Sequence, residues 1–237
     1  MSETAFFFPK NKKMTELEKE LLQEERCYVI DSSIDYNAYV TIDLSSMSAL
    51  LKENHPKTAA DYDVLLENYL EDKKAKVAYG GYIEQRSLYE RCSVFNNSRE
   101  KERNIHLGVD LWIKAGTPVL AALEGKVHSF QNNNNVGDYG PTIILEHLLN
   151  TCTFYTLYGH LSLESIENIK IGQVFSKGEP LATLGDASVN GDYAAHLHFQ
   201  IISDLEGKTG DYPGVCSEET LSFYQLNCPD PNLLLKI

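Results

Sequence analysis

The 237-residue sequence lacks long apolar runs, and this lack excludes a membrane-spanning helix. Such a helix needs about 18 or more consecutive apolar residues, and no stretch approaches that length. The first residues, Met-Ser-Glu-Thr-Ala-Phe-Phe-Phe-Pro, contain no basic segment, and their apolar run is too short for a secretion signal. We therefore expect a cytoplasmic protein with no membrane partner, exported only if a leader precedes these residues.

Paired cysteines are also missing. The five cysteines, at positions 27, 92, 152, 216 and 228, include no CxxC spacing. An odd number without such pairs favours neither a disulfide framework nor a cysteine zinc site. We expect reduced, buried thiols.

Positive charge is scarce. The chain has 21 Lys and Arg against 34 Asp and Glu, a formal net charge of −13. A surface of this sign repels DNA, RNA and anionic lipid, so no nucleic-acid partner is expected. The remaining composition is that of an ordinary globular protein, long enough for a large domain with a smaller accessory region.

Residues 1–80 show a mixed, partly helical pattern without a motif that carries chemistry. The capping box at Thr15–Glu18 and an apolar stripe after it indicate the first helix. The predicted elements are a helix over about 15–26, a strand over 39–44, a short helix over 45–54 and an amphipathic helix over 61–74. We predict an accessory region over 1–80 and a second domain over 81–237.

The pattern changes after Gly81. From about residue 105 to 202 the chain is a series of short runs of strand-forming residues, separated by Gly, Asn, Asp and Pro. The clearest runs are Pro118–Ala122, Lys126–Phe130, Thr142–Glu146, Thr153–Tyr158 and Pro180–Leu184. Regularly spaced short strands predict a mainly β fold, a sheet or barrel, rather than a parallel α/β sheet.

One of these runs, residues 194–202, carries two histidines. Side chains alternate between the faces of a strand, so His196 and His198 emerge on one face with Cα atoms about 6.6 Å apart. Leu197 and Phe199 then point the other way, into a core. Two imidazoles on one face of an otherwise apolar strand indicate a functional site.

Further groups with metal or acid–base chemistry lie in the same β region: His106, Asp110 and His160. A catalytic zinc ion takes three nitrogen or oxygen ligands and keeps one position open for water. Either His196 or His198 can complete a ligand set with His106 and Asp110, while the other imidazole reaches the water. Neutral imidazoles beside such a water can move its proton.

Taken together, these motifs resemble a known family. His106-x-Gly-x-Asp110, Ala115-Gly-Thr-Pro-Val119, Tyr158-Gly-His-Leu161 and His196-Leu-His-Phe199 follow one another as in the lysostaphin-like (LytM-type) zinc metalloendopeptidases, which cut peptide bonds of bacterial peptidoglycan. The resemblance covers about residues 104–202. It implies a groove-bearing antiparallel β-sheet with a barrel-like form, a Zn²⁺ cofactor and a peptide substrate.

The resemblance also implies a role for each residue. Zinc would be held by His106, Asp110 and His198. His196 would be the general base, and His160 would orient the water or stabilise the tetrahedral intermediate. Of the other candidates, we expect His147 to be structural or at the groove rim.

Two hypotheses from different classes remain open at this point. In the first hypothesis, the chain is a zinc hydrolase of a peptide amide bond, in peptidoglycan or in a cytosolic peptide. Alternatively, it is a non-catalytic module that binds a peptide or metabolite on the same fold. Intact ligand positions favour the enzyme.

Overall fold

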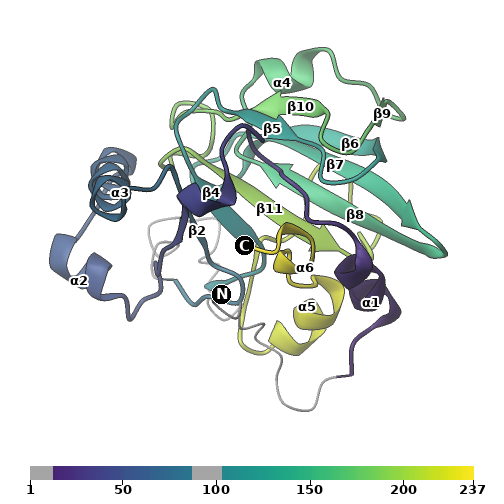
Figure 1. Ribbon diagram of the computed structural model, residues 1–237, viewed down its shortest axis with the longest axis horizontal. Coiled ribbons are helices and arrows are strands. Elements are labelled where there is room, and N and C mark those ends of the chain that lie inside the picture. Colours follow the sequence, from purple (N-terminus) through teal and green to yellow (C-terminus); the bar gives the residue numbers. More distant parts are fainter. Residues whose placement is uncertain (1–12, 87–102) are drawn as a thin grey trace.

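A computed structural model describes residues 13–86 and 103–237 (Figure 1). Its helices are α1 (Glu16–Gln23), the 3-10 helix η1 (Tyr36–Ala38), α2 (Ala49–Asn54), α3 (Ala59–Lys73), α4 (Glu164–Glu167), α5 (Leu221–Asn227) and α6 (Asn232–Leu235). Its strands are β1 (Tyr39–Thr41), β2 (Val77–Gly80), β3 (Ile105–His106), β4 (Val109–Trp112), β5 (Pro118–Leu120), β6 (Gly125–Asn133), β7 (Gly140–Leu149), β8 (Cys152–Gly159), β9 (Val174–Phe175), β10 (Pro180–Thr183), β11 (His196–Ile202) and β12 (Val215–Cys216).

An eight-stranded sheet dominates the molecule, in the order β1-β2-β4-β11-β8-β7-β6-β9. Every neighbouring pair is antiparallel except β1 and β2. The predicted mainly β, antiparallel fold is therefore confirmed. The sheet has two edges, β1 and β9, so it is open and not closed into a barrel.

The parallel pair follows from the connection between its strands. Parallel neighbours need a long crossover, which is usually helical, and α2 and α3 occupy the chain between β1 and β2. Figure 1 shows both helices beside the β2–β4 end of the sheet. The first part of the chain thus extends the same sheet to which the later strands belong, while the division into domains at residue 80 stays a prediction.

Side chains cap the first turns of α1, α2 and α3, and these caps explain where α2 and α3 begin. Thr58 accepts from the Asp61 backbone while the Asp61 carboxylate accepts from Thr58, so α3 begins at Ala59, before the predicted start at Asp61. Ser48 caps α2, which therefore begins four residues after the predicted start. The predicted capping box Thr15–Glu18 is confirmed at α1, although this helix ends at Gln23.

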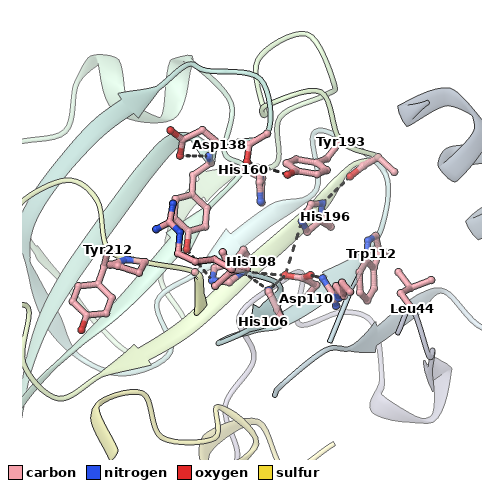
Figure 2. A pocket seen from close by; sticks show the side chains of 18 of the residues that line it. Leu44, His106, Asp110, Trp112, Asp138, His160, Tyr193, His196, His198 and Tyr212 are labelled. Carbon is pink, nitrogen blue, oxygen red and sulfur yellow. Dashed lines mark hydrogen bonds and ion pairs between the residues drawn. The ribbon is translucent and has the colours of Figure 1, made fainter. Parts of the chain in front are cut away.

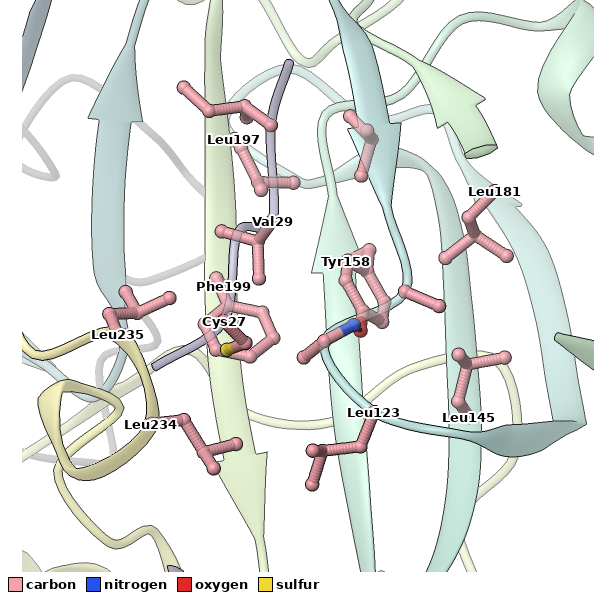
Figure 3. Close-up of a cluster of buried hydrophobic side chains, with 14 of the residues drawn as sticks. Cys27, Val29, Leu123, Leu145, Tyr158, Leu181, Leu197, Phe199, Leu234 and Leu235 are labelled. Carbon is pink, nitrogen blue, oxygen red and sulfur yellow. Dashed lines mark hydrogen bonds between the residues drawn. The ribbon is translucent and has the colours of Figure 1, made fainter. Parts of the chain in front are cut away.

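The main hydrophobic core lies on one face of the sheet (Figure 3). Leu197 and Phe199 of β11 are fully buried in it, as the alternation predicted. Figure 3 shows Cys27 and Val29 of the N-terminal segment and Leu234 of α6 packed near these strands. The apolar positions of β11 thus fix the strand, and its polar positions face the opposite side.

The cysteines at 27, 152, 216 and 228 are free thiols, three of them buried, while Cys92 lies outside the described residues.

Among residues 13–86 and 103–237, no helix has the length and apolar character needed to cross a membrane.

Candidate metal centre

Three strands bring His106, Asp110 and His198 together. Asp110 on β4 lies directly opposite His198 on β11 in the antiparallel register, and His106 is on the adjacent short strand β3. Gly108, between the two motif residues, permits this approach. A Cβ there would lie only 2.6 Å from Cε1 of His198, so no other residue fits without displacement.

The candidate ligand atoms of these three residues converge. Nε2 of His106 lies 2.8 Å from Nδ1 of His198, and Oδ1 of Asp110 lies 3.1 Å from Nδ1 of His198 and 3.3 Å from Nε2 of His106. All three side chains are buried. In the part of the chain that the structure describes, this is the group whose arrangement suits a metal ion.

Hydrogen bonds on the far side of each ring set which nitrogen faces the cluster. Nδ1 of His106 is 2.9 Å from the Gly81 carbonyl oxygen, and Nε2 of His198 is 2.9 Å from Oε1 of Gln200. Because these oxygens only accept, the ring nitrogens facing them carry hydrogen. Nε2 of His106 and Nδ1 of His198 therefore present lone pairs to Asp110.

Arg86 contacts the opposite side of the Asp110 carboxylate. Its Nη1 lies 2.5 Å from Oδ2 of Asp110, and its Nε lies 3.3 Å from Glu84. Burial acts to raise the pKa of Asp110, but the positive charge of Arg86 opposes it, and that pKa lies well below its usual range. Asp110 is therefore ionised, with Oδ1 directed at the imidazoles and Oδ2 engaged by Arg86.

His196 and His160 lie beside this cluster (Figure 2). Nε2 of His196 is 3.9 Å from Oδ1 of Asp110, and the two imidazole rings have centroids 4.1 Å apart. Nδ1 of each ring faces a backbone carbonyl at 2.7 Å, that of Ala194 for His196 and that of Asn190 for His160. Burial lowers the pKa of both residues, so both are neutral near pH 7 with Nε2 free to accept a proton.

All five residues that the sequence singled out thus line one pocket. His147 does not. It is buried elsewhere, with Nδ1 2.8 Å from the Glu124 carbonyl and Nε2 2.7 Å from the Thr156 hydroxyl. Both of its ring nitrogens are engaged by the protein, as the structural interpretation of this residue requires.

Sequence reasoning missed three neighbours of the cluster: Arg86, Tyr139 and Gln200. The Tyr139 hydroxyl lies 3.4 Å from Nε2 of His198. Gln200 follows His196 and His198 at the same two-residue spacing, so the alternation of the strand could have identified it. No local pattern links Arg86 to Asp110, because the two residues are 24 positions apart.

The pocket differs between its two ends (Figure 2). Asp138 and Tyr212 lie on one side of the histidines and Leu44 and Trp112 on the other. The Trp112 ring stacks on His196 with centroids 5.8 Å apart. The pocket thus has polar side chains at one end and apolar ones at the other.

Residues 104–210 match the profile described as peptidase family M23. An uncharacterised metalloprotease of Haemophilus influenzae is 33% identical over 95 residues, which are 40% of this chain and 18% of that protein. The match with this curated relative thus spans less than a fifth of its length. The predicted resemblance to lysostaphin-like metallopeptidases is confirmed for this segment.

Solved structures of two peptidases are similar to part of this chain. The catalytic domain of the antimicrobial peptidase lysostaphin from Staphylococcus simulans is 27% identical, with a TM-score of 0.36 over 52% of this chain and 80% of that one. A zinc-containing peptidase from Vibrio cholerae is 28% identical, with a TM-score of 0.34 over 45% and 31%.

Proposed function

We propose that this chain is a zinc-dependent metallopeptidase that hydrolyses a peptide amide bond. The observation that carries the proposal is the convergence of Nε2 of His106, Oδ1 of Asp110 and Nδ1 of His198, which the hydrogen bonds on the far side of each ring leave as acceptors. Three acceptors within 3.3 Å of one another repel unless a cation lies among them.

The donor set fits zinc. Two imidazoles and a carboxylate are a ligand set of catalytic zinc sites, and ligands on a tetrahedral ion at about 2.0–2.1 Å lie about 3.3 Å from one another. The separations of 2.8, 3.1 and 3.3 Å are near this value. Histidine ligands of zinc also use the N–H of their second ring nitrogen to donate a hydrogen bond to an oxygen, as His106 and His198 do here.

When bound, Zn²⁺ supplies Lewis acidity and lowers the pKa of water to about 7. The chain's own residues would handle the proton. His196 has its Nε2 free and lies nearest to the cluster, so it would accept the proton of the attacking water and pass it to the leaving amine.

His160 has a narrower role in this proposal. Its Nδ1 hydrogen is directed to Asn190, and burial keeps the ring neutral, so Nε2 accepts a hydrogen bond and does not donate one. Of the two roles implied by the family, the geometry supports orientation of the water over stabilisation of an anionic intermediate.

The deciding measurement is the zinc content of protein purified without chelators or added metal. We expect about one zinc per chain in the wild type and none in His198→Ala, since zinc sites of this kind need three protein ligands. His128→Ala is the matched control, because His128 faces Ser129 outside the pocket and its loss should leave zinc in place.

Peptide cleavage by the zinc-loaded protein separates the two hypotheses of function. Cleavage by the wild type and His128→Ala, but not by His198→Ala, supports the enzyme. Full zinc occupancy without cleavage of any peptide tested would favour the non-catalytic binding module. Failure of the wild type to take up zinc would contradict the metal site itself.

A further inference from the structure

The pocket has an apolar wall that comes from outside the segment matched to the peptidase family. Leu44, Ala59 and Tyr62 precede residue 81, yet they line the same pocket as the five histidine and aspartate residues. Leu44 and Tyr62 share a hydrophobic cluster with Trp112 and Ala194. We call the three residues Leu44, Ala59 and Tyr62 the N-terminal wall.

The N-terminal wall is held firmly against the site. Ala59 and Tyr62 are three residues apart on α3, so they occupy the same face of that helix. Tyr62 of α3 packs in the same buried hydrophobic cluster as Ala194, which lies two residues before His196. The Leu44 backbone donates to the Glu84 carboxylate at 3.3 Å. These contacts tie α3 and the segment after β1 to the histidine strand.

The wall also adjoins the group that would act as base. Trp112 lies opposite His196 in the sheet register and stacks on its ring. Trp112, in turn, belongs to the same cluster as Leu44 and Tyr62. A substrate residue that contacts the N-terminal wall therefore lies next to the scissile bond, at which His196 would transfer the proton.

The chemistry of this end selects one kind of side chain. The wall and its neighbours in the cluster present aliphatic and aromatic groups. The cation over the Trp112 ring, Arg86, is engaged by the carboxylates of Asp110 and Glu84. A charged substrate side chain would lose its hydration here without gaining an opposite charge, whereas an apolar one gains from leaving water.

From this arrangement we propose that the N-terminal wall forms a subsite for one apolar side chain, that of the substrate residue adjoining the scissile bond. The proposal rests on the peptidase function above and adds a substrate class to it. The preferred peptides carry an aliphatic or aromatic residue at that position, in preference to glycine or a charged residue.

A size change at one end of α3 tests the subsite. The wild type, Ala59→Leu and Ala60→Leu are loaded with zinc and given a defined mixture of synthetic peptides in which all pairs of neighbouring residue types occur. Mass spectrometry then maps the cleaved bonds. Ala59 is buried and lines the pocket, whereas Ala60 is exposed, so the two variants add the same side chain to the same helix in different places.

We expect Ala59→Leu to fill the subsite. Cleavage beside Leu, Met or Phe should fall about tenfold or more relative to cleavage beside Gly or Ala, a range typical for small volume changes in an apolar pocket. Ala60→Leu should keep the wild-type preference. If Ala59→Leu does not fold, Leu44→Ala enlarges the same wall and should raise the preference for Phe over Leu.

The outcomes separate the two proposals. Cleavage with the same preference in the wild type, Ala59→Leu and Leu44→Ala would overturn the subsite and leave the peptidase function standing. Absence of any cleavage by zinc-loaded wild type would overturn the peptidase function, and the subsite with it.

Discussion

Buried histidines occur in two surroundings in this molecule, and the comparison separates a structural histidine from a candidate functional one. At His147, on β7, both ring nitrogens contact protein groups, the Glu124 carbonyl and the Thr156 hydroxyl. In the pocket, one nitrogen of each imidazole faces an oxygen of the protein, and the other is turned toward Asp110 or a neighbouring ring. Burial is common to both, so the second nitrogen makes the difference.

The largest effect on turnover is expected when the imidazoles proposed to move the proton are removed. We expect His196→Ala and His160→Ala to keep zinc and to lose turnover by about 10²–10⁴-fold, the usual contribution of a positioned acid or base. Zinc content and kcat on the same peptide are the measurements. If His196→Ala emptied the site as completely as His198→Ala, the division between ligands and bases would be wrong.

A second test concerns Arg86, the cation beside the pocket histidines, whereas the groups bonded to His147 are an uncharged carbonyl and hydroxyl. In Arg86→Met the buried Asp110 loses its ion pair, which should lower the free energy of unfolding by about 3–5 kcal/mol in zinc-free protein. Added zinc supplies positive charge to the same carboxylate. It should therefore raise the melting temperature of Arg86→Met more than that of the wild type.

Chemical denaturation with and without zinc measures this effect. Lys126→Met is a suitable control, because Lys126 forms an exposed ion pair with Glu146 that is expected to contribute little. Equal stabilisation of Arg86→Met and wild type by zinc would mean that Arg86 does not compensate the charge of Asp110.

The smallest effect is expected at His147, where the change should be in stability alone. Burial lowers the pKa of His147 to about 4, below the unfolded value of about 6.5. Its contribution to stability is thus fully present above pH 6.5 and is lost as the pH falls toward 4, by about 3 kcal/mol in all.

The variant His147→Gln removes this proton-binding group while retaining polar atoms. The wild type should lose more stability than the variant between pH 7 and pH 4.5, as measured by urea denaturation. Zinc content and turnover at pH 7.5 should be unchanged in the variant. Loss of zinc in properly folded His147→Gln would place this residue with the pocket histidines after all.

Much of the sheet could be predicted from the sequence because strands and their faces follow a two-residue period. The alternation along β11 correctly sent Leu197 and Phe199 to the core, and the five predicted site residues meet in one pocket. Helix bounds were less accurate. At α3, for example, Asp61 closes a capping box inside the helix and does not begin it.

Contacts between distant segments were not accessible to the same reasoning. Neither the pairing of β2 with β4 nor the ion pair of Arg86 with Asp110 has a local signature. The N-terminal wall depends on α3 packing against Ala194, just before β11 and more than 100 positions later in the chain. Such contacts arise from the packing of the whole sheet, which a periodic pattern does not specify.

The oxygen that fixes His196 has a consequence for how this site tolerates sequence change. The acceptor is the main-chain carbonyl of Ala194, and every amino acid supplies that atom. Position 194 is therefore constrained by the space in its buried cluster and not by the need for this acceptor. Gly81 is constrained more tightly, since a Cβ there would lie 2.1 Å from Arg86 and 2.9 Å from His106. Similar sites are therefore defined by the positions of the peptide oxygens around the imidazole rings, and less by the identity of the residues that supply them.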